Sequence, residues 1–138
     1  MSKTHKAAWA AGFFDGDGYV TVQVRGGKYK GHYIVAGINH VAEAPIREII
    51  KLYGGKFRKQ RADKVVGNRK QRIEWKLTCS GAERFLRQIQ PYLVNKNEVV
   101  SKALELQSTM GTTCKVSDDV LAIRHDLKRQ IQEINAKD

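Results

Sequence analysis

The most informative stretch of the sequence reads Ala10-Ala11-Gly12-Phe13-Phe14-Asp15-Gly16-Asp17-Gly18. The residues before it favour a helix over roughly residues 5–14, capped by Thr4, and the residues after it alternate as in a β-strand. A helix therefore runs into an Asp-Gly turn, and a strand leaves that turn directly. Two carboxylates at the negative end of a helix dipole favour a hard divalent cation, although a solvated Asp-Gly turn explains the same residues.

These nine residues resemble the motif of the LAGLIDADG homing endonucleases. Five positions match it letter for letter and four depart from it, mostly by exchanging apolar residues. The matching residues are Ala11, Gly12, Asp15, Asp17 and Gly18, and the departing residues are Ala10, Phe13, Phe14 and Gly16. The resemblance implies that the motif helix ends with Asp17 at an active site and that the next strand lies on DNA.

The composition limits the class of protein. A chain of 138 residues is long enough for one domain with a real core, so we expect a single domain over residues 1–138. No apolar run approaches membrane-spanning length and no targeting signal is visible, so no membrane partner is expected. Cys79 and Cys114 are too few for a disulfide framework or a zinc site, which favours an intracellular protein.

The charge points to a polyanionic partner. The formal net charge is +11, from 25 basic and 14 acidic residues. Residues 23–76 hold 14 Lys or Arg against 4 acids, so the excess lies in the region that reads as strands rather than on an amphipathic helix. The expected partner is double-stranded DNA, because a two-stranded ribbon fits the major groove.

The remaining elements follow from periodicity and from helix-capping and turn residues. Strands are expected at roughly 19–25, 32–39, 57–61 and 71–78, with the last two joined around Gly67-Asn68. Helices are expected from Pro45 to Gly54, from the capping box Ser80-Gly81-Ala82-Glu83 to Pro91, and at roughly 96–108 and 118–135. The last is expected to have Ser117 as its cap and to bury Val120, Ile123, Leu127, Ile131 and Ile134.

This order predicts an α+β fold with four antiparallel strands, helices on one face and a polar, basic other face. The αββαββα order is also that of the LAGLIDADG fold, whose sheet is shaped like a saddle. The resemblance therefore covers most of the chain, with the helices at 96–135 as part of the same domain.

Two further site residues are implied by the resemblance. The segment from Phe85 to Lys96 is similar to one in single-motif members where a helix ends at Gln-Pro and an active-site lysine follows, which assigns Lys96. The family also places a water-ordering polar residue after the second strand, where Asn39 and His40 both fit and His40 is preferred. A further basic residue of the family has no clean match here, and Arg47 is the candidate. From the residues alone, Lys96 is an ordinary surface lysine and His40 a partly buried strand end.

Asp17 and the carbonyl of Gly16 are the expected ligands of Mg²⁺, which can polarise a phosphate and stabilise the leaving oxygen. They are too few to hold the ion alone, so two chains meeting at their motif helices would complete the sites. The small side chains of Ala7, Ala8, Ala11 and Gly12 suit the seam of such a homodimer. Asp15 is expected to cap or orient the turn rather than bind metal.

We therefore predict a Mg²⁺-dependent, intron-encoded homing endonuclease that cuts a long pseudo-palindromic DNA site as a homodimer. The alternative is a non-cleaving nucleic-acid-binding protein of the same fold, such as an RNA-splicing maturase or a transcriptional regulator; the retained motif acids and Lys96 argue against it. Alternation along the strands assigns nine residues to the DNA-facing surface: Gln23, Arg25, Lys28, Lys30, Lys59, Arg61, Arg72, Glu74 and Lys76.

Overall fold

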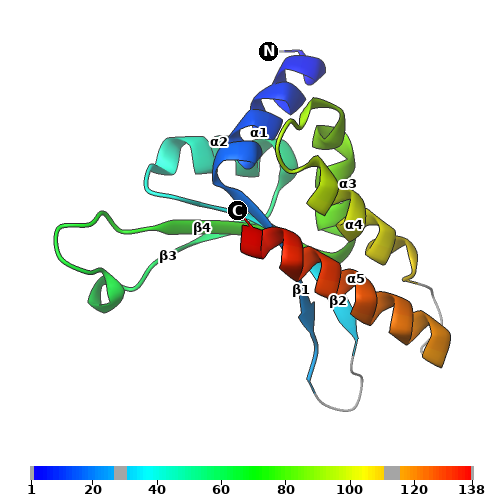
Figure 1. Ribbon diagram of the computed structural model, residues 1–138. Coiled ribbons are helices and arrows are strands. Elements are labelled where there is room, and N and C mark those ends of the chain that lie inside the picture. The colour runs from blue at the N-terminus through cyan, green and yellow to red at the C-terminus, as the bar shows by residue number, and fades with distance from the viewer. Residues whose placement is uncertain (1, 27–30, 111–115, 138) are drawn as a thin grey trace.

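The computed structural model describes residues 2–26, 31–110 and 116–137, and it has the predicted α+β architecture (Figure 1). The predicted αββαββα order is confirmed, and two further helices follow it. The elements are α1 (Lys3–Asp17), β1 (Gly18–Val24), β2 (His32–His40), α2 (Glu43–Tyr53), β3 (Lys56–Lys59), the 3₁₀ turn η1 (Ala62–Lys64), β4 (Ile73–Thr78), α3 (Cys79–Ile89), the 3₁₀ turn η2 (Gln90–Tyr92), α4 (Asn97–Ser108) and α5 (Asp118–Lys137).

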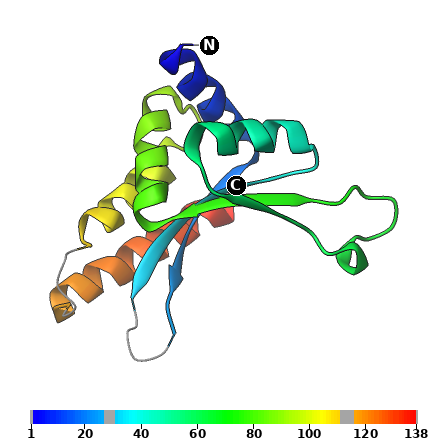
Figure 2. The same cartoon turned by 180° about the vertical axis from the view of Figure 1, so that it is seen from behind.

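The four strands form one antiparallel sheet in the order β1-β2-β4-β3. Helices α1, α2, α3 and α4 lie on one side of the sheet, while the β3–β4 arm and the β1–β2 hairpin project away from them (Figures 1 and 2). Helix α5 packs against β1 and α4. The sheet therefore has a helix-covered face and an open face, as the sequence predicted.

The core forms where the helices meet the sheet. Phe85 of α3 lies at its centre, with the rings of Phe14, Tyr53 and Trp75 edge-on to it at centroid distances of 5.5, 4.8 and 5.1 Å. The buried Trp75 indole donates a 2.8 Å hydrogen bond to the carbonyl of Gly54, which fixes the end of α2. Each large side chain buried here contributes about 1.5–3 kcal/mol to stability.

Helix α1 is longer than predicted. It begins at Lys3, and the hydroxyl of Ser2, not Thr4, caps it by accepting a hydrogen bond from the main-chain N–H of His5. It also continues through Asp17, so the two motif acids lie in its last turn rather than in a turn beyond it. The carboxylates therefore sit on a rigid element.

The predicted cap of α3 was wrong. Helix α3 begins at Cys79, so Ser80 lies inside it, and Glu83 pairs with Arg87 at 3.1 Å instead of closing a capping box. The β3–β4 hairpin has its turn at Gly67-Asn68, as predicted, although β3 ends at Lys59, β4 begins at Ile73 and η1 lies between them.

Helix α5 also packs differently from its predicted pattern. Ser117 caps it as expected, and Leu127 and Ile131 are buried, but Ile123 is exposed. Arg124 is buried instead, because its guanidinium donates hydrogen bonds of 2.9 and 2.8 Å to the hydroxyl and the carbonyl of Thr109 at the end of α4. In the described ranges no helix is both long and apolar enough to cross a bilayer.

Candidate active site

The α1–β1 junction places Asp17 where the first helix meets the sheet. Gly18 follows at once as the first residue of β1, and its N–H donates to the carbonyl of Phe14. A Cβ at Gly18 would lie 2.4 Å from the Phe14 ring, so this direct passage from helix to strand requires glycine. The Asp17 side chain is 46% exposed at that point, so it is open to a ligand.

Asp15, in the same turn, accepts hydrogen bonds on both oxygens from main-chain N–H groups of its own chain. One carboxylate oxygen accepts a 2.7 Å hydrogen bond from the main-chain N–H of Val94. The other accepts bonds of 3.2 and 3.0 Å from Asn95 and Lys96. Asp15 thus orients the turn before α4, about eighty residues away in the sequence, a contact that sequence reasoning did not predict.

His40 lies beside Asp17. Its Nδ1 atom is 3.1 Å from the Oδ2 atom of Asp17, and its ring packs edge-on against Phe13 at 5.2 Å. In the sheet register His40 stands opposite Ile73, on the helix-covered face, whereas Asn39 stands opposite Glu74 on the open face. Of the two alternatives left by the sequence, His40 is the one that reaches Asp17.

Lys96 reaches the same junction from the other side. It is held by Asp15 just before α4 and lines a hollow of about 320 Å³ together with Gly18, Tyr19 and Asn135. The residues predicted to be catalytic therefore come from three separate segments near the end of α1, where His40 contacts Asp17 and the main chain of Lys96 is held by Asp15.

Asn135 was missed by the sequence analysis. Its side-chain amide donates a 2.8 Å hydrogen bond to the carbonyl of Val20, which ties the last turns of α5 to the edge strand beside the junction. A single asparagine near the end of an amphipathic helix carries no sequence signal for such a contact.

The donors at this junction suit a hard cation. Asp17 offers a carboxylate, and Gly16 lies in the last helical turn, where main-chain carbonyls lack helical partners. Oxygen ligands of this kind fit Mg²⁺. Across the described ranges no cluster of three or more Asp, Glu, His or Cys surrounds a possible metal position, so one chain supplies only part of a coordination shell.

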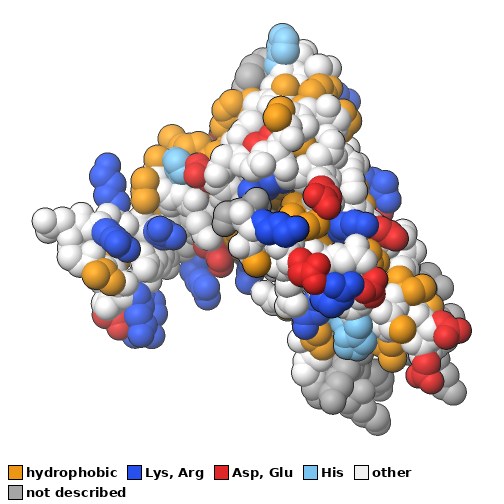
Figure 3. Space-filling view, in the orientation of Figure 1, with side chains coloured by type: hydrophobic (Ala, Val, Ile, Leu, Met, Phe, Trp, Pro, Cys, Tyr) orange, Lys and Arg blue, Asp and Glu red, His pale blue; other side chains and the backbone are white. Residues whose placement is uncertain are grey.

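The open face carries three of the polar side chains predicted for DNA contact. Because residues directly opposite each other share a face, the register places Gln23, Glu74 and Lys76 there. Gln23 accepts a 2.6 Å hydrogen bond from the hydroxyl of Tyr33, and the guanidinium of Arg25 covers the same ring at 5.2 Å. Lys and Arg side chains gather on the β3–β4 arm, at the left in Figure 3, whereas α5 carries both signs.

The predicted position of Lys59 on the DNA-facing surface of the sheet was wrong. Lys59 stands opposite Ile73 on the helix-covered face and lies 3.5 Å from Glu43 of α2. The alternation in β3 is shifted by one residue, so Lys56 and Arg58 occupy the open face instead, opposite Lys76 and Glu74.

The other predicted basic residues have mixed placements. Arg61 and Arg72 lie in the connection between β3 and β4, where Arg61 pairs with Asp63 at 3.0 Å. Arg47 pairs with Glu43 at 3.1 Å and covers the ring of Phe57, so it is engaged on the flank of α2. Lys28 and Lys30 lie outside the described residues.

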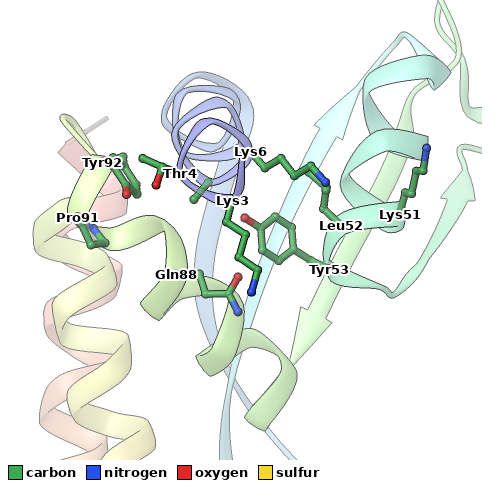
Figure 4. A pocket seen from close by; sticks show the side chains of 10 residues that line it. Lys3, Thr4, Lys6, Lys51, Leu52, Tyr53, Gln88, Pro91 and Tyr92 are labelled. Atoms are coloured by element: carbon green, nitrogen blue, oxygen red, sulfur yellow. The ribbon is translucent and has the colours of Figure 1, made fainter. Parts of the chain in front are cut away.

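A separate hollow of about 580 Å³ lies at the opposite, N-terminal end of α1 (Figure 4). Lys3, Lys6, Lys51 and Tyr53 are among the residues that line it. Neither motif acid lies in it, so it is not part of the α1–β1 junction.

Comparison with known proteins gives matches by structure. No protein family model and no curated protein sequence matches the chain. Two DNA complexes of the homing endonuclease I-CvuI match with TM-scores of 0.79 and 0.80 at 21% identity, over 96% of this chain and 83% of theirs. The archaeal intron-encoded homing endonuclease I-Vdi141I, also bound to DNA, matches with a TM-score of 0.77 at 12% identity, over 96% of this chain and 86% of its own.

The meganuclease I-SmaMI, a LAGLIDADG homing endonuclease, matches with a TM-score of 0.74 at 17% identity. The match covers 89% of this chain but 43% of that one. The chain therefore has the fold of the LAGLIDADG homing endonucleases, as its motif predicted.

Proposed function

We propose that the protein is a site-specific, Mg²⁺-dependent DNA endonuclease that cuts both strands of a long pseudo-palindromic site as a homodimer. The observation that supports this proposal is the contact between Asp17 and His40 at the end of α1, with the main chain of Lys96 held by the neighbouring Asp15, beside a sheet with a basic open face. The shared fold adds support, since I-CvuI and I-Vdi141I are homing endonucleases with structures bound to DNA. I-Vdi141I is intron-encoded, and intron encoding is part of the proposal.

Each residue has a role that follows from its position. Asp17 and the Gly16 carbonyl would hold Mg²⁺ together with DNA and water oxygens, and the bound ion would supply charge stabilisation at the phosphate. His40, 3.1 Å from Asp17, orients that carboxylate and orders water beside it. The Lys96 ammonium group offsets negative charge that develops on the phosphate.

Two observations support the proposed homodimer. Each chain has a single Asp17, and α1 has an exposed stripe of small residues. One chain offers one Asp17, whereas a double-strand cut needs two attacks. Ala8, Gly12 and Gly16 are exposed and four residues apart, so they form one open stripe along the helix. A Cβ at Gly12 or Gly16 would meet nothing within 4 Å, which leaves room for a second α1 helix.

The exposed stripe of α1 differs from the small-residue face predicted from the sequence. Ala11, which was assigned to it, is fully buried in the core of its own chain, and Ala7 is half-buried. Gly16 extends the exposed stripe in their place, so a twofold axis along it would bring the two Asp17 residues together.

Cleavage of plasmids that carry a library of sites, with Mg²⁺ and with a chelator, tests the function. The wild type should cut both strands only with the metal, and Asp17→Asn should lose cutting while its DNA affinity stays within about tenfold, since only a metal ligand is removed. The matched control is Asp126→Asn, which removes an exposed carboxylate of α5 and should leave cutting intact.

Two results would contradict the proposal. Cutting by Asp17→Asn would remove Asp17 from the site. A wild type that binds DNA or RNA tightly but never cuts with Mg²⁺ would favour the alternative of a maturase or a transcriptional regulator.

A further inference from the structure

Glu74 is the one acidic side chain that the described strand residues place on the open face. The same face carries Lys56, Arg58 and Lys76. A carboxylate repels the phosphates of DNA, so its position on a surface proposed to bind DNA needs a specific reason.

The Glu74 carboxylate is held in place from both sides. The hydroxyl of Tyr19 donates a hydrogen bond of 3.3 Å to its Oε2 atom, and Arg58 lies 3.6 Å from its Oε1 atom. Tyr19 belongs to β1 and Glu74 to β4, so the ring must cross β2. It does so over Gly37, where a Cβ would lie 2.6 Å from the tyrosine ring.

Tyr19 remains a hydrogen-bond donor throughout the useful pH range. Burial raises the pKa of its hydroxyl to about 12, and the neighbouring charge of Glu74 acts in the same direction. Because the phenol keeps its proton, it can donate to the Glu74 carboxylate over this range. The Glu74 side chain is 30% exposed, so acceptor positions remain open to a ligand.

Glu74 is surrounded by other side chains that can form hydrogen bonds. A hollow of about 210 Å³ on the open face is lined by Asn39, Arg58, Gln60, Arg72 and Glu74. An ionised carboxylate only accepts hydrogen bonds. In the major groove the N4 amine of cytosine and the N6 amine of adenine are donors, whereas guanine presents only acceptors. A carboxylate matches cytosine better, because the N7 acceptor of adenine lies beside its amine and repels the carboxylate.

We propose that Glu74 is a specificity-determining residue that accepts a hydrogen bond from the N4 amine of one cytosine in each half-site, with Tyr19 as its positioning residue. This rests on the proposed function, in which the open face lies in the major groove. A homodimer carries two copies of the pair, so the two cytosines are related by the twofold axis of the site.

The test compares the sequences that each variant selects from a random double-stranded DNA library by binding, without cleavage. The wild type should enrich cytosine at one position of each half-site. Glu74→Gln should shift that position towards adenine, because glutamine pairs with adenine, and should lower the cytosine-over-adenine preference by about tenfold or more. Preferences at the other positions should not change.

Two further variants separate the parts of the proposal. Tyr19→Phe keeps the ring over Gly37 but removes the hydrogen bond, so it should weaken the cytosine preference without changing the preferred base. Glu43→Gln is the matched control, since Glu43 pairs with Arg47 and Lys59 on the helix-covered side and should not affect base preference. Circular dichroism checks the fold of each variant.

Several outcomes would overturn the inference. If Glu74→Gln selects the same bases as the wild type, Glu74 does not read a base. If it changes the affinity for all sequences equally, Glu74 only neutralises Arg58. If Tyr19→Phe behaves as the wild type, Tyr19 does not position the carboxylate. If the wild type does not bind DNA at all, the proposed function and this inference are both wrong. The other three results concern base preference alone and leave the proposed function standing.

Discussion

The carboxylate of Asp15 accepts a 3.0 Å hydrogen bond from the main-chain N–H of Lys96, across 81 residues of sequence. Its second oxygen is taken by the N–H of Val94. The two motif acids therefore differ in their availability, because Asp15 is used within the chain while Asp17 faces outward. Asp15 thereby links the motif helix to the segment that carries the proposed catalytic lysine.

The first prediction is that Asp15→Asn slows cleavage without abolishing metal dependence. An amide presents a donor to N–H groups where the carboxylate presented acceptors, so the 94–96 turn loosens and Lys96 is misplaced. We expect the single-turnover rate to fall about tenfold or more, and the free energy of unfolding to fall by about 1–3 kcal/mol.

The Mg²⁺ concentration for half-maximal cleavage separates this role from that of a metal ligand, and it should stay at the wild-type value. Assays well below the unfolding midpoint exclude simple loss of fold. A variant that cuts DNA at the wild-type rate would show that the Asp15–Lys96 contact does not matter for catalysis.

The second prediction concerns stability at mildly acid pH. His32 is 5% exposed, and its ring packs edge-on against His125 at 4.6 Å. Burial lowers its pKa below the usual value, and the nearby His125, Lys128 and Arg124 lower it further. The unfolded chain therefore binds a proton more readily than the folded chain, so stability is complete above about pH 6.5 and falls as the pH drops below it.

Urea unfolding between about pH 7 and pH 5 measures this loss. His32→Phe keeps an apolar ring in the site and should flatten the pH dependence in that window. The loss of stability at lower pH should remain in this variant. Arginine partners hold the pKa values of Glu43 and Asp126 below their usual range, so these acids lose their pairing only when they are protonated. An unchanged slope in His32→Phe would refute the assignment.

The sequence was sufficient for the order of elements and for the junction at Asp17, because the motif and the hydrophobic periodicity are both local. It was insufficient for the last turn of α1, since an Asp-Gly pair favours a turn and the contact of Asp15 with residues 94–96 has no local signal. The Asn135–Val20 contact joins residues 115 positions apart, and no local pattern encodes it.

The face of β3 on which Lys59 lies could not be predicted from the sequence either, for a different reason. Arg58 and Lys59 are adjacent and both basic, and in a strand of four residues alternation does not show which one faces out. The pairing of β3 with β4 settles it, since a shift of one residue exchanges the two faces.

The third prediction uses this difference between the faces. DNA affinity should fall as salt rises, with a slope of log K against log salt of about −0.9 for each phosphate contact. Arg58→Gln or Lys76→Gln should make the slope shallower by about one contact. Lys59→Gln removes the same charge from the helix-covered face and should leave the slope unchanged. A flat salt response of the wild type would contradict DNA binding by the open face.

The fourth prediction tests the seam between the two chains. Gly12 is exposed on α1 and a side chain there meets no atom of its own chain within 4 Å, so Gly12→Leu should fold normally. It even replaces glycine by a better helix former, worth up to about 1 kcal/mol. Two α1 helices in contact along the stripe have no space for two leucines, so the variant should be monomeric in sedimentation and should lose double-strand cutting.

Ala11→Leu provides the contrast, one residue away on the same helix. Ala11 is fully buried, so the larger side chain overpacks the core and should lower the unfolding midpoint of the subunit itself. Circular dichroism and thermal unfolding separate the two effects. A Gly12→Leu variant that still dimerises and cuts both strands would place the seam elsewhere. A wild type that is monomeric both free and on a cleaved site would rule out the twofold arrangement. In that case one chain, with only one Asp17, would cut both strands.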